Sequence, residues 1–235
     1  MKIIAIIQAR MSSHRLPGKS LARVDGRPLL QMVLERLDRC IGLDGCVVAT
    51  STDSSDDAIE SFCRSHAVAA YRGNLTNVAS RFRAIAKQES CDALVRVNGD
   101  SPLIDPRLID QGIGRYCACE YDLVTNVHPR TYPRGQSVEV VRATAFERAY
   151  SLMCEPADFE HVTRVFYRRA DDFQIGSFRH VSDLSRVQMS VDSADDLERV
   201  RRIAARMTRP HVEYGLDALV RLHHEDASRC LEAAR

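Results

Sequence analysis

The stretch IIAIIQARMSSHRLPGKSL, residues 3–21, joins an apolar run directly to a loop rich in positive charge. Its β-branched start predicts a buried strand over residues 2–7. The loop that follows brings together three permanently charged side chains and a glycine: Arg10, Arg15, Lys19 and Gly18. The glycine lets the backbone approach a ligand closely, and backbone amides add to the side-chain charge. At the carboxyl end of a strand, such a loop favours a phosphate site over a solvated turn.

The loop follows neither of the common phosphate-binding sequence patterns. It lacks the G-x-x-x-x-G-K-[ST] of P-loops and the G-x-G-x-x-G of dinucleotide-binding domains, so another nucleotide-binding fold is expected. The whole chain has 33 basic and 32 acidic residues. Its positive charge is therefore a local concentration, and neither nucleic acid nor a membrane surface is an expected partner.

Length and composition indicate a globular protein. The 235 residues, 45% of them apolar, are enough to bury a sizeable core. The apolar start before Gln8 is too short for a signal peptide or a membrane-spanning helix, so we expect a cytoplasmic location. The eight cysteines have no C-x-x-C spacing and fit reduced thiols. Cys117 and Cys119 form the only close pair, and a metal site there is disfavoured.

The first half of the chain alternates short apolar runs with amphipathic segments. The runs predict strands over residues 46–50, 67–71 and 93–97. The segments between them predict helices over residues 28–40, 56–66 and 77–88. Helices between strands imply an α/β fold with a mainly parallel sheet, whose ligands bind outside the carboxyl ends of the strands.

The second half has a less regular pattern. Strands are predicted over residues 121–127, 137–141 and 187–192, and helices over residues 143–152, 158–169, 193–207 and 216–232. No linker is long enough to divide the chain, so a single domain over residues 1–235 is expected. Within it we expect a nucleotide- and metal-binding core over residues 1–120 and 185–205. We also expect a small second lobe for the acceptor over residues 121–184 and a C-terminal helical segment over residues 206–235.

Two aspartates follow predicted strands. Asp100 lies in the glycine turn of RVNGDSPLIDP, and Asp192 ends the run VQMSVD. Magnesium in phosphate sites typically takes one or two carboxylates together with substrate oxygens. Asp100 alone would also fit the cap of a turn or helix. With Asp192 opposite the basic loop, the pair predicts a cation, a charge clamp and a cleft suited to transfer at phosphorus.

Six motifs together resemble a known family: IIQARMSSHRLPGKSL, YRGNLTNVASRF, RVNGDSPLIDP, TYPRGQSVEVV, EHVTRVFYRR and SVDSADDLERVRRI. They are similar to cytidylyltransferases of the type of spore coat polysaccharide biosynthesis protein F. That family is related to the synthetases of CMP-3-deoxy-manno-octulosonate (CMP-KDO) and CMP-sialic acid. The resemblance implies a GT-A-like, Rossmann-like three-layer fold and a magnesium-dependent transfer of CMP from CTP to an acceptor, an acidic sugar in the first place, with release of pyrophosphate.

The resemblance also assigns residues to roles. It implies that Arg10, Lys19 and Asp100 are catalytic and that Asp100 and Asp192 bind the metal. The nucleotide-binding residues that it implies are Ala9, Arg10, Arg15, Gly18, Lys19, Arg72, Asn98 and Gly99. Among them Arg72 is similar to an arginine that helps to read the pyrimidine, and Asn98 is expected near the base or ribose.

The acceptor side of the resemblance comprises Tyr132, Arg134, Glu139 and His161. Arg134 suits a carboxylate or phosphonate, whereas a structural role fits Glu139 and His161 equally well. The family commonly reads T-Y-P-R-G-L-D-V-E, and here Gln136 and Ser137 replace the leucine and aspartate. Asn77 likewise stands where relatives often carry aspartate. The first two differences leave the identity of the acceptor open, whereas Asn77 concerns the contacts around Arg72 and Arg81.

Other functions fit parts of this pattern. A nucleotidylyltransferase of the same fold could use a phosphonate or a polyol phosphate as acceptor. A GT-A glycosyltransferase usually holds its metal with Asp-x-Asp, and no two aspartates in this chain are two residues apart. A non-catalytic nucleotide-binding module is disfavoured by the intact set of Lys19, Asp100 and Asp192. Relatives of this kind are often homodimers, and the helical segments within residues 143–169 are the expected interface.

Overall fold

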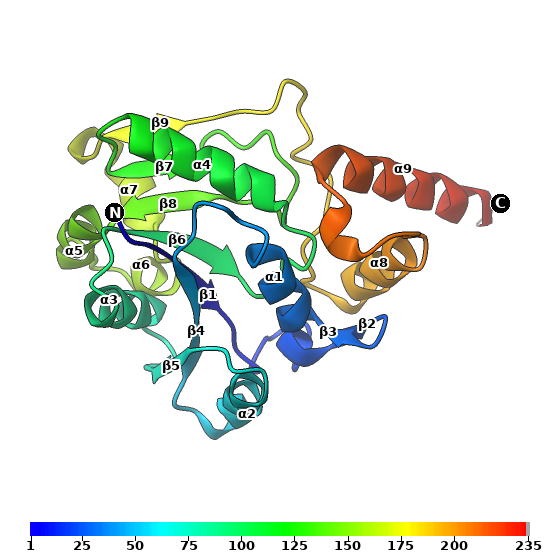
Figure 1. Ribbon diagram of the computed structural model, residues 1–235, viewed down its shortest axis with the longest axis horizontal. Helices are drawn as coiled ribbons and strands as arrows, with labels where there is room; N and C mark the ends of the chain where they lie inside the picture. Colours follow the sequence, from blue (N-terminus) through cyan, green and yellow to red (C-terminus); the bar gives the residue numbers. More distant parts are fainter. Residues whose placement is uncertain (234–235) are drawn as a thin grey trace.

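The computed structural model describes residues 1–233, and its centre is a seven-stranded sheet with the strand order β5-β4-β1-β6-β8-β7-β9 (Figure 1). The strands are β1 (Ile3–Gln8), β4 (Gly45–Ser51), β5 (Ala70–Gly73), β6 (Ala93–Asn98), β7 (Leu123–Thr125), β8 (Glu139–Arg142) and β9 (Ile175–Ser177). β8 runs antiparallel to both of its neighbours, and the other strand pairs are parallel. The predicted α/β fold with a mainly parallel sheet is confirmed.

Helices cover both faces of this sheet. One face carries α1 (Leu29–Leu37), α2 (Asp57–Ser65) and α4 (Pro106–Ala118), and the other carries α3 (Val78–Gln88), α5 (Ala143–Ser151) and α7 (Arg164–Arg168). In β1, Ile3 and Ile7 pack with the first group, whereas Ile4 and Ile6 pack with the second. A strand buried on both faces needs a continuous apolar run, which explains the first residues of the chain.

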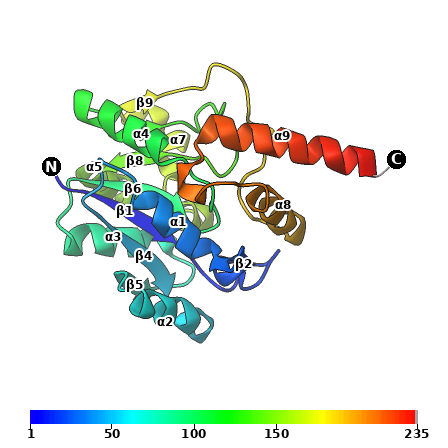
Figure 2. The same cartoon turned by 45° about the vertical axis from the view of Figure 1, so that its right-hand side comes forward.

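The C-terminal helices lie beside the sheet. α8 (Ala194–Ala204) and α9 (Leu216–Ala233) pack on each other, and α9 projects away from the rest of the protein in two views (Figure 1, Figure 2). The buried Arg36 of α1 attaches this part by donating hydrogen bonds to three carbonyl groups, those of Ile104, His211 and Tyr214. The last two residues of the predicted 206–235 segment lie outside the described residues.

The remaining elements are short. β2 (Arg23–Val24) and β3 (Arg27–Pro28) form a separate antiparallel pair, and α6 (Pro156–Glu160) precedes α7. The 3-10 helices are η1 (Lys19–Leu21), η2 (Ser54–Asp56), η3 (Ala170–Asp172) and η4 (His211–Glu213). Within residues 1–233, every helix is either too short or too polar to traverse a lipid bilayer.

The strand predicted over residues 187–192 is wrong. Within this segment only Gln188 forms a β-bridge, and its partner is Arg134. The N–H of Arg134 donates to the carbonyl of Val187, and its carbonyl accepts from the N–H of Met189. The N–H of Val191 then donates to the carbonyl of Asp100 at 2.8 Å. Because the segment changes partner within three residues, it forms no ladder.

Two other boundaries differ from the prediction. The helix predicted over residues 158–169 is divided into α6 and α7, because Val162 between them has a left-handed φ of 36°. α6 also begins earlier, since Pro156 occupies its first turn and a capping box precedes it. β5 begins later than predicted because Ala67, with a φ of 53°, still belongs to the turn after α2.

The segment expected to form a second lobe supplies β7, β8 and β9, which extend the same sheet. Its helices α5 and α7 share the α3 face of that sheet. The division into a core and an acceptor lobe stays a prediction.

Candidate active site

The loop after β1 is folded back on itself and anchored. The N–H of Gly18 donates to the carbonyl of Met11 at 2.8 Å, and Gly18 has a φ of 77°, which glycine adopts without strain. The N–H of Met11 in turn donates to Oδ1 of the buried Asp56 at 2.6 Å. The hydroxyl of Ser20 donates to the carbonyl of Arg10 at 3.0 Å. The basic side chains therefore stand on a fixed turn at the carboxyl end of β1.

Lys19 and two aspartates form a compact charge cluster. The Lys19 ammonium lies 2.6 Å from Oδ2 of Asp100 and 3.4 Å from Oδ1 of Asp192. It also donates to the carbonyl of Val191 at 2.9 Å. Arg15 pairs with the same Oδ1 of Asp192 at 2.8 Å. Three segments that are distant in the sequence thus converge at one edge of the sheet.

These residues line a cleft of about 320 Å³ outside the carboxyl ends of β1 and β6. Of the nucleotide and metal residues predicted from the sequence, those that line the cleft are Ala9, Arg10, Arg15, Lys19, Asp100 and Asp192. His161 from the predicted acceptor group lines it as well. The location agrees with the rule that ligands of α/β sheets bind at the carboxyl ends of the strands.

Arg81 of α3 also lines the cleft, and the sequence-based assignment missed it. Its side chain is 2% exposed, and within the described part of the chain its Nε and Nη1 have no hydrogen-bond partner. Burial lowers its pKa to about 10, against the opposing effect of Asp56. The sequence did hold a signal, because Arg81 interrupts the apolar face of α3 formed by Val78, Phe82 and Ile85.

Glu160, at the end of α6, is a second missed residue. Its Oε1 lies 3.1 Å from Nη2 of Arg10, and the residue lines the cleft. Arg10, His14 and Glu160 also line an adjoining cavity of about 660 Å³. No local pattern in EHVTRVFYRR distinguishes Glu160 from a surface residue, so its place in the cleft could not be predicted from the sequence.

Three of the predicted nucleotide-binding residues, Arg72, Asn98 and Gly99, are not among the residues that line the cleft. Arg72 pairs with Asp57 and Glu60 of α2, at 2.7 Å each, and these hydrogen bonds raise its pKa. Gly99 donates its N–H to the carbonyl of Gln8 at 2.9 Å, and a Cβ there would lie 3.1 Å from the same oxygen. Oδ1 of Asn98 is buried without a hydrogen-bond partner among the described residues.

Two residues of the predicted acceptor group are buried. Glu139 is 3% exposed and lies 2.7 Å from Nη1 of Arg96, and the hydroxyl of Tyr167 donates to it. Burial raises the pKa of Glu139, but Arg96 and Tyr167 together hold it below its usual value. Tyr132 is 4% exposed and stacks edge-on against Phe178. Neither residue lines the cleft.

Arg134, the fourth member of the predicted acceptor group, has an exposed side chain. Its backbone is fixed by hydrogen bonds to Val187 and Met189, which lie shortly before Asp192 in the chain. The next residue, Gly135, packs so closely on this segment that a Cβ would lie 2.6 Å from the backbone nitrogen of Ser190. Arg134 therefore stands on a rigid turn, and it is not among the residues that line the cleft.

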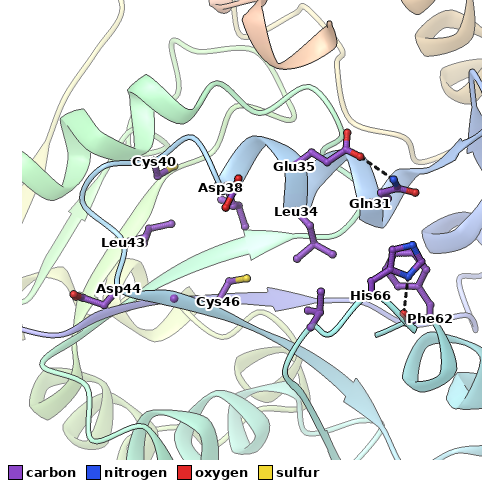
Figure 3. A pocket seen from close by; sticks show the side chains of 13 residues that line it. Gln31, Leu34, Glu35, Asp38, Cys40, Leu43, Asp44, Cys46, Phe62 and His66 are labelled. Carbon is purple, nitrogen blue, oxygen red and sulfur yellow. Dashed lines mark hydrogen bonds between the residues drawn. The ribbon is translucent and has the colours of Figure 1, made fainter. Parts of the chain in front are cut away.

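A separate cavity of about 530 Å³ lies between α1 and α2 at the amino end of β4 (Figure 3). Leu34 and Leu43 contribute apolar surface, and Asp38 and Asp44 are exposed carboxylates beside it. Its lining residues, all within the described part of the chain, include neither lysine nor arginine. Its charge therefore does not suit a triphosphate, and the cleft at the opposite ends of the strands does.

Comparisons with known proteins agree with this location. Residues 4–222 match the family described as Cytidylyltransferase. The chain is 34% identical over 200 residues to the protein MJ1063 of Methanocaldococcus jannaschii, covering 84% of this chain and 81% of that protein. It is 28% identical over 211 residues to the spore coat polysaccharide biosynthesis protein SpsF of Bacillus subtilis, covering 86% and 85%.

A further relative aligns with only part of this chain. The 3-deoxy-manno-octulosonate cytidylyltransferase of Pelobacter propionicus is 39% identical over 116 residues, and the alignment covers 48% of this chain and 44% of that enzyme.

Solved structures show the same fold. A cytidylyltransferase of Leptospira borgpetersenii superposes with a TM-score of 0.92 at 26% identity, covering 97% of this chain and 96% of that one. The CMP:2-keto-3-deoxy-manno-octonic acid synthetase in complex with CTP superposes with a TM-score of 0.65 at 21% identity, covering 87% and 99%. The fold is thus the GT-A-like nucleotidyltransferase fold. With its family match along nearly the whole chain, the protein belongs to the cytidylyltransferase family, which transfers CMP from CTP.

Proposed function

We propose that the protein transfers CMP from CTP to an acidic sugar, with magnesium as cofactor, and releases pyrophosphate. The observation that carries this proposal is the convergence of Lys19, Asp100 and Asp192 in one cleft at the carboxyl ends of the strands. Transfer at phosphorus depends mainly on positioning and on stabilisation of charge. A cleft in which fixed cations and two carboxylates meet supplies both.

The proposed triphosphate site consists of Arg10, Arg15, Lys19 and Arg81. An acceptor oxygen attacks the α-phosphorus in line, the bond to the β-phosphate oxygen breaks, and the cations stabilise the leaving pyrophosphate. The unpartnered guanidinium atoms of Arg81 support this role, because buried donors in proteins are normally satisfied. Phosphate oxygens would satisfy them.

Asp100 and Asp192 are the proposed magnesium ligands. Both offer hard carboxylate oxygens, and a single Lys19 ammonium is within reach of both, so the space between them already accommodates a cation. No group of three or more metal-ligating side chains exists within residues 1–233. Two carboxylates are nevertheless sufficient for magnesium when phosphate oxygens complete its shell. Bound there, magnesium would neutralise charge on the phosphates.

The remaining nucleotide contacts are proposed from position. Ala9 borders the cleft, and Gly18 and Gly99 allow close approach of the backbone at the loop and at the end of β6. The unpartnered Oδ1 of Asn98 is available to the base or ribose. Reading of the pyrimidine by Arg72 stays a prediction, because its guanidinium is held by α2.

The acidic acceptor is proposed from Arg134 and from the named relatives. Arg134 is exposed on a rigid turn, where a guanidinium suits a carboxylate. Relatives include a 3-deoxy-manno-octulosonate cytidylyltransferase and a spore coat polysaccharide biosynthesis protein. His161 is proposed as a further contact because it lines the cleft. Glu139 and Tyr132 would act indirectly, by fixing the sheet from which the acceptor side is built.

The experiment is a screen of acceptors with CTP and magnesium, read by pyrophosphate release and by product mass. The panel contains 3-deoxy-manno-octulosonate and other acidic sugars, neutral sugars, a phosphonate and a polyol phosphate. We expect release with acidic sugars and a product heavier than the acceptor by one esterified CMP. Release only with the phosphonate or polyol phosphate would contradict the sugar acceptor, and absence of any CMP adduct would contradict the transferase.

We also propose that the enzyme works as a homodimer in which the helices between residues 143 and 169 meet. Sedimentation velocity should give about twice the mass of 26.4 kDa. A monomer at micromolar concentration would contradict this assembly.

A further inference from the structure

Glu160 is a cleft carboxylate without a role in the arrangement proposed above. Asp100 and Asp192 are held by Lys19 and Arg15 and are proposed to bind the metal. Glu160 is held only through Arg10, at 3.1 Å, among the residues that the structure describes. It is therefore the cleft carboxylate that is not proposed as a metal ligand and that has Arg10 as its one side-chain partner among the described residues.

The backbone that carries Glu160 is firmly fixed. A capping box between Glu155 and Asp158 starts α6. The fully buried Asp158 also pairs with Arg164 at 2.7 Å and with Arg168 at 2.8 Å. The carboxylate of Glu160 is thus presented to the cleft from a rigid support, as a catalytic group requires.

The ion pair itself is easily broken. The Arg10 side chain is 32% exposed and that of Glu160 is 47% exposed. Partly exposed ion pairs contribute little to stability, whereas an arginine binds a phosphate through strong charge-assisted hydrogen bonds. A triphosphate in the cleft would take the guanidinium of Arg10 and release Glu160.

The pair also lies between two cavities. Arg10, His14 and Glu160 line both the cleft and the adjoining cavity of about 660 Å³, which Asn74 and Phe159 also border. Once Arg10 turns to the phosphates, the freed carboxylate borders the space on both sides. An acceptor hydroxyl that enters there meets Glu160 on its way to the α-phosphorus.

We propose that Glu160 is the general base that activates the acceptor, and that Arg10 holds it until the nucleotide binds. This inference rests on the proposed function. In the step, the Glu160 carboxylate takes the proton of the acceptor hydroxyl while the oxygen forms its bond to the α-phosphorus. The bond between the α-phosphorus and the bridging oxygen breaks, pyrophosphate leaves with that electron pair, and Glu160 later returns the proton to water.

Other charged and titratable groups share the cleft with Glu160. Arg10 and His14 come from the loop after β1, and Arg81 comes from α3. His161 directly follows Glu160 in the chain. The two histidines are the alternative bases. Variants of His14 and His161 therefore belong in the test.

The test compares Glu160→Gln with the wild type. Glutamine keeps the size of the side chain and can still accept a hydrogen bond from Arg10, but it cannot take the proton. We expect kcat to fall about 10²–10⁴-fold, with loss of its acidic limb in the pH profile, while CTP still stabilises the protein against heat. The control is Glu120→Gln, at an exposed glutamate that does not line the cleft, and it should keep nearly the wild-type rate.

Rescue provides a second readout. Formate should restore part of the rate of Glu160→Ala and none of the rate of Lys19→Ala. A Glu160→Gln enzyme within threefold of the wild-type kcat would overturn the proposal. So would loss of CTP binding in that variant, an acidic limb that disappears only in His14→Gln or His161→Gln, or a Glu160→Ala rate that formate does not raise. A wild type that forms no CMP adduct would instead refute the proposed function itself.

Discussion

The Lys19 ammonium and the Asp100 carboxylate are 2.6 Å apart, although 81 residues separate them in the chain. Asp192 approaches the same nitrogen within 3.4 Å from the other end of the sequence. The sheet makes this meeting possible, because parallel β1 and β6 are direct neighbours and end at the same edge. The proposed chemistry depends on this position.

Lys19→Ala is expected to lower kcat at least about 100-fold, because it removes a charge next to the transferring phosphoryl group. The fold should remain intact, since Lys19 stands at the border of the cleft and not in the core. Steady-state kinetics and circular dichroism check both points. Lys87→Ala, a 60% exposed lysine on α3, serves as the control. A Lys19→Ala enzyme with nearly normal kcat would contradict the assigned role.

Asp100→Asn and Asp192→Asn should each raise the magnesium concentration needed for half-maximal activity by about tenfold or more, because an amide is a weaker ligand than a carboxylate. Titration of activity with magnesium at fixed CTP measures this. The neighbouring Asp195 is exposed, so Asp195→Asn is the matched control. An unchanged magnesium dependence in both cleft variants would exclude them as ligands.

Asp56→Ala is expected to weaken CTP binding without touching the nucleotide. The buried carboxylate accepts hydrogen bonds from the N–H groups of Met11 and Ser51, at 2.6 and 3.1 Å, and so fixes the loop after β1. Leaving a buried donor unsatisfied costs about 1–3 kcal/mol. Urea unfolding and CTP titration measure the two effects. Asp171→Ala, at an exposed aspartate that does not line the cleft, is the control, and equal losses in both variants would contradict the anchoring role.

Breaking the pair of Arg96 and Glu139 should destabilise the protein strongly. Both partners are largely buried, and removing one leaves the other charge uncompensated, at a cost of about 3–5 kcal/mol. Glu139→Gln and Arg96→Met are therefore each expected to lower the free energy of unfolding. The decrease in the double variant should be smaller than the sum of the two single decreases. Additive losses in a double-mutant cycle would contradict direct coupling.

Stability should also depend on pH through His211. Burial lowers the pKa of His211 below its ordinary value of 6.5, although its Nε2 lies 2.6 Å from Glu35, and the nearby Arg36 and Arg27 act in the same direction as burial. As the pH falls below 6.5, the unfolded chain binds a proton that the folded protein resists, so the free energy of unfolding decreases until the folded pKa is passed. His211→Asn should reduce this slope, and an unchanged slope would contradict the assignment.

Local sequence patterns were enough to predict much of the fold and part of the cleft. The apolar run of β1 and the basic loop after it lie within one stretch, so their order alone predicts charge at a strand end. Asp100 follows β6 in the same way. The positions of these residues can be predicted from a strand and the loop that directly follows it.

The rest depends on distant parts of the chain. Arg81 and Glu160 reach the cleft from α3 and α6, and only the packing of both helices over one sheet face brings them there. The sequence pattern predicts Arg72 as a nucleotide contact but does not predict its pairing with the carboxylates of α2. Residues 187–192 have the alternation of a strand, yet a strand also needs a partner in register, and Arg134 provides a single bridge.

The most direct test of the central claim is thermal unfolding of the wild-type protein with magnesium and each of CTP, UTP, ATP and GTP. A ligand at a hundred times its Kd raises the free energy of unfolding by about 2.7 kcal/mol. We predict that CTP stabilises the protein most, and that Asp100→Asn loses the part of this effect that requires magnesium. Equal stabilisation by all four nucleotides, or none by CTP, would contradict the account.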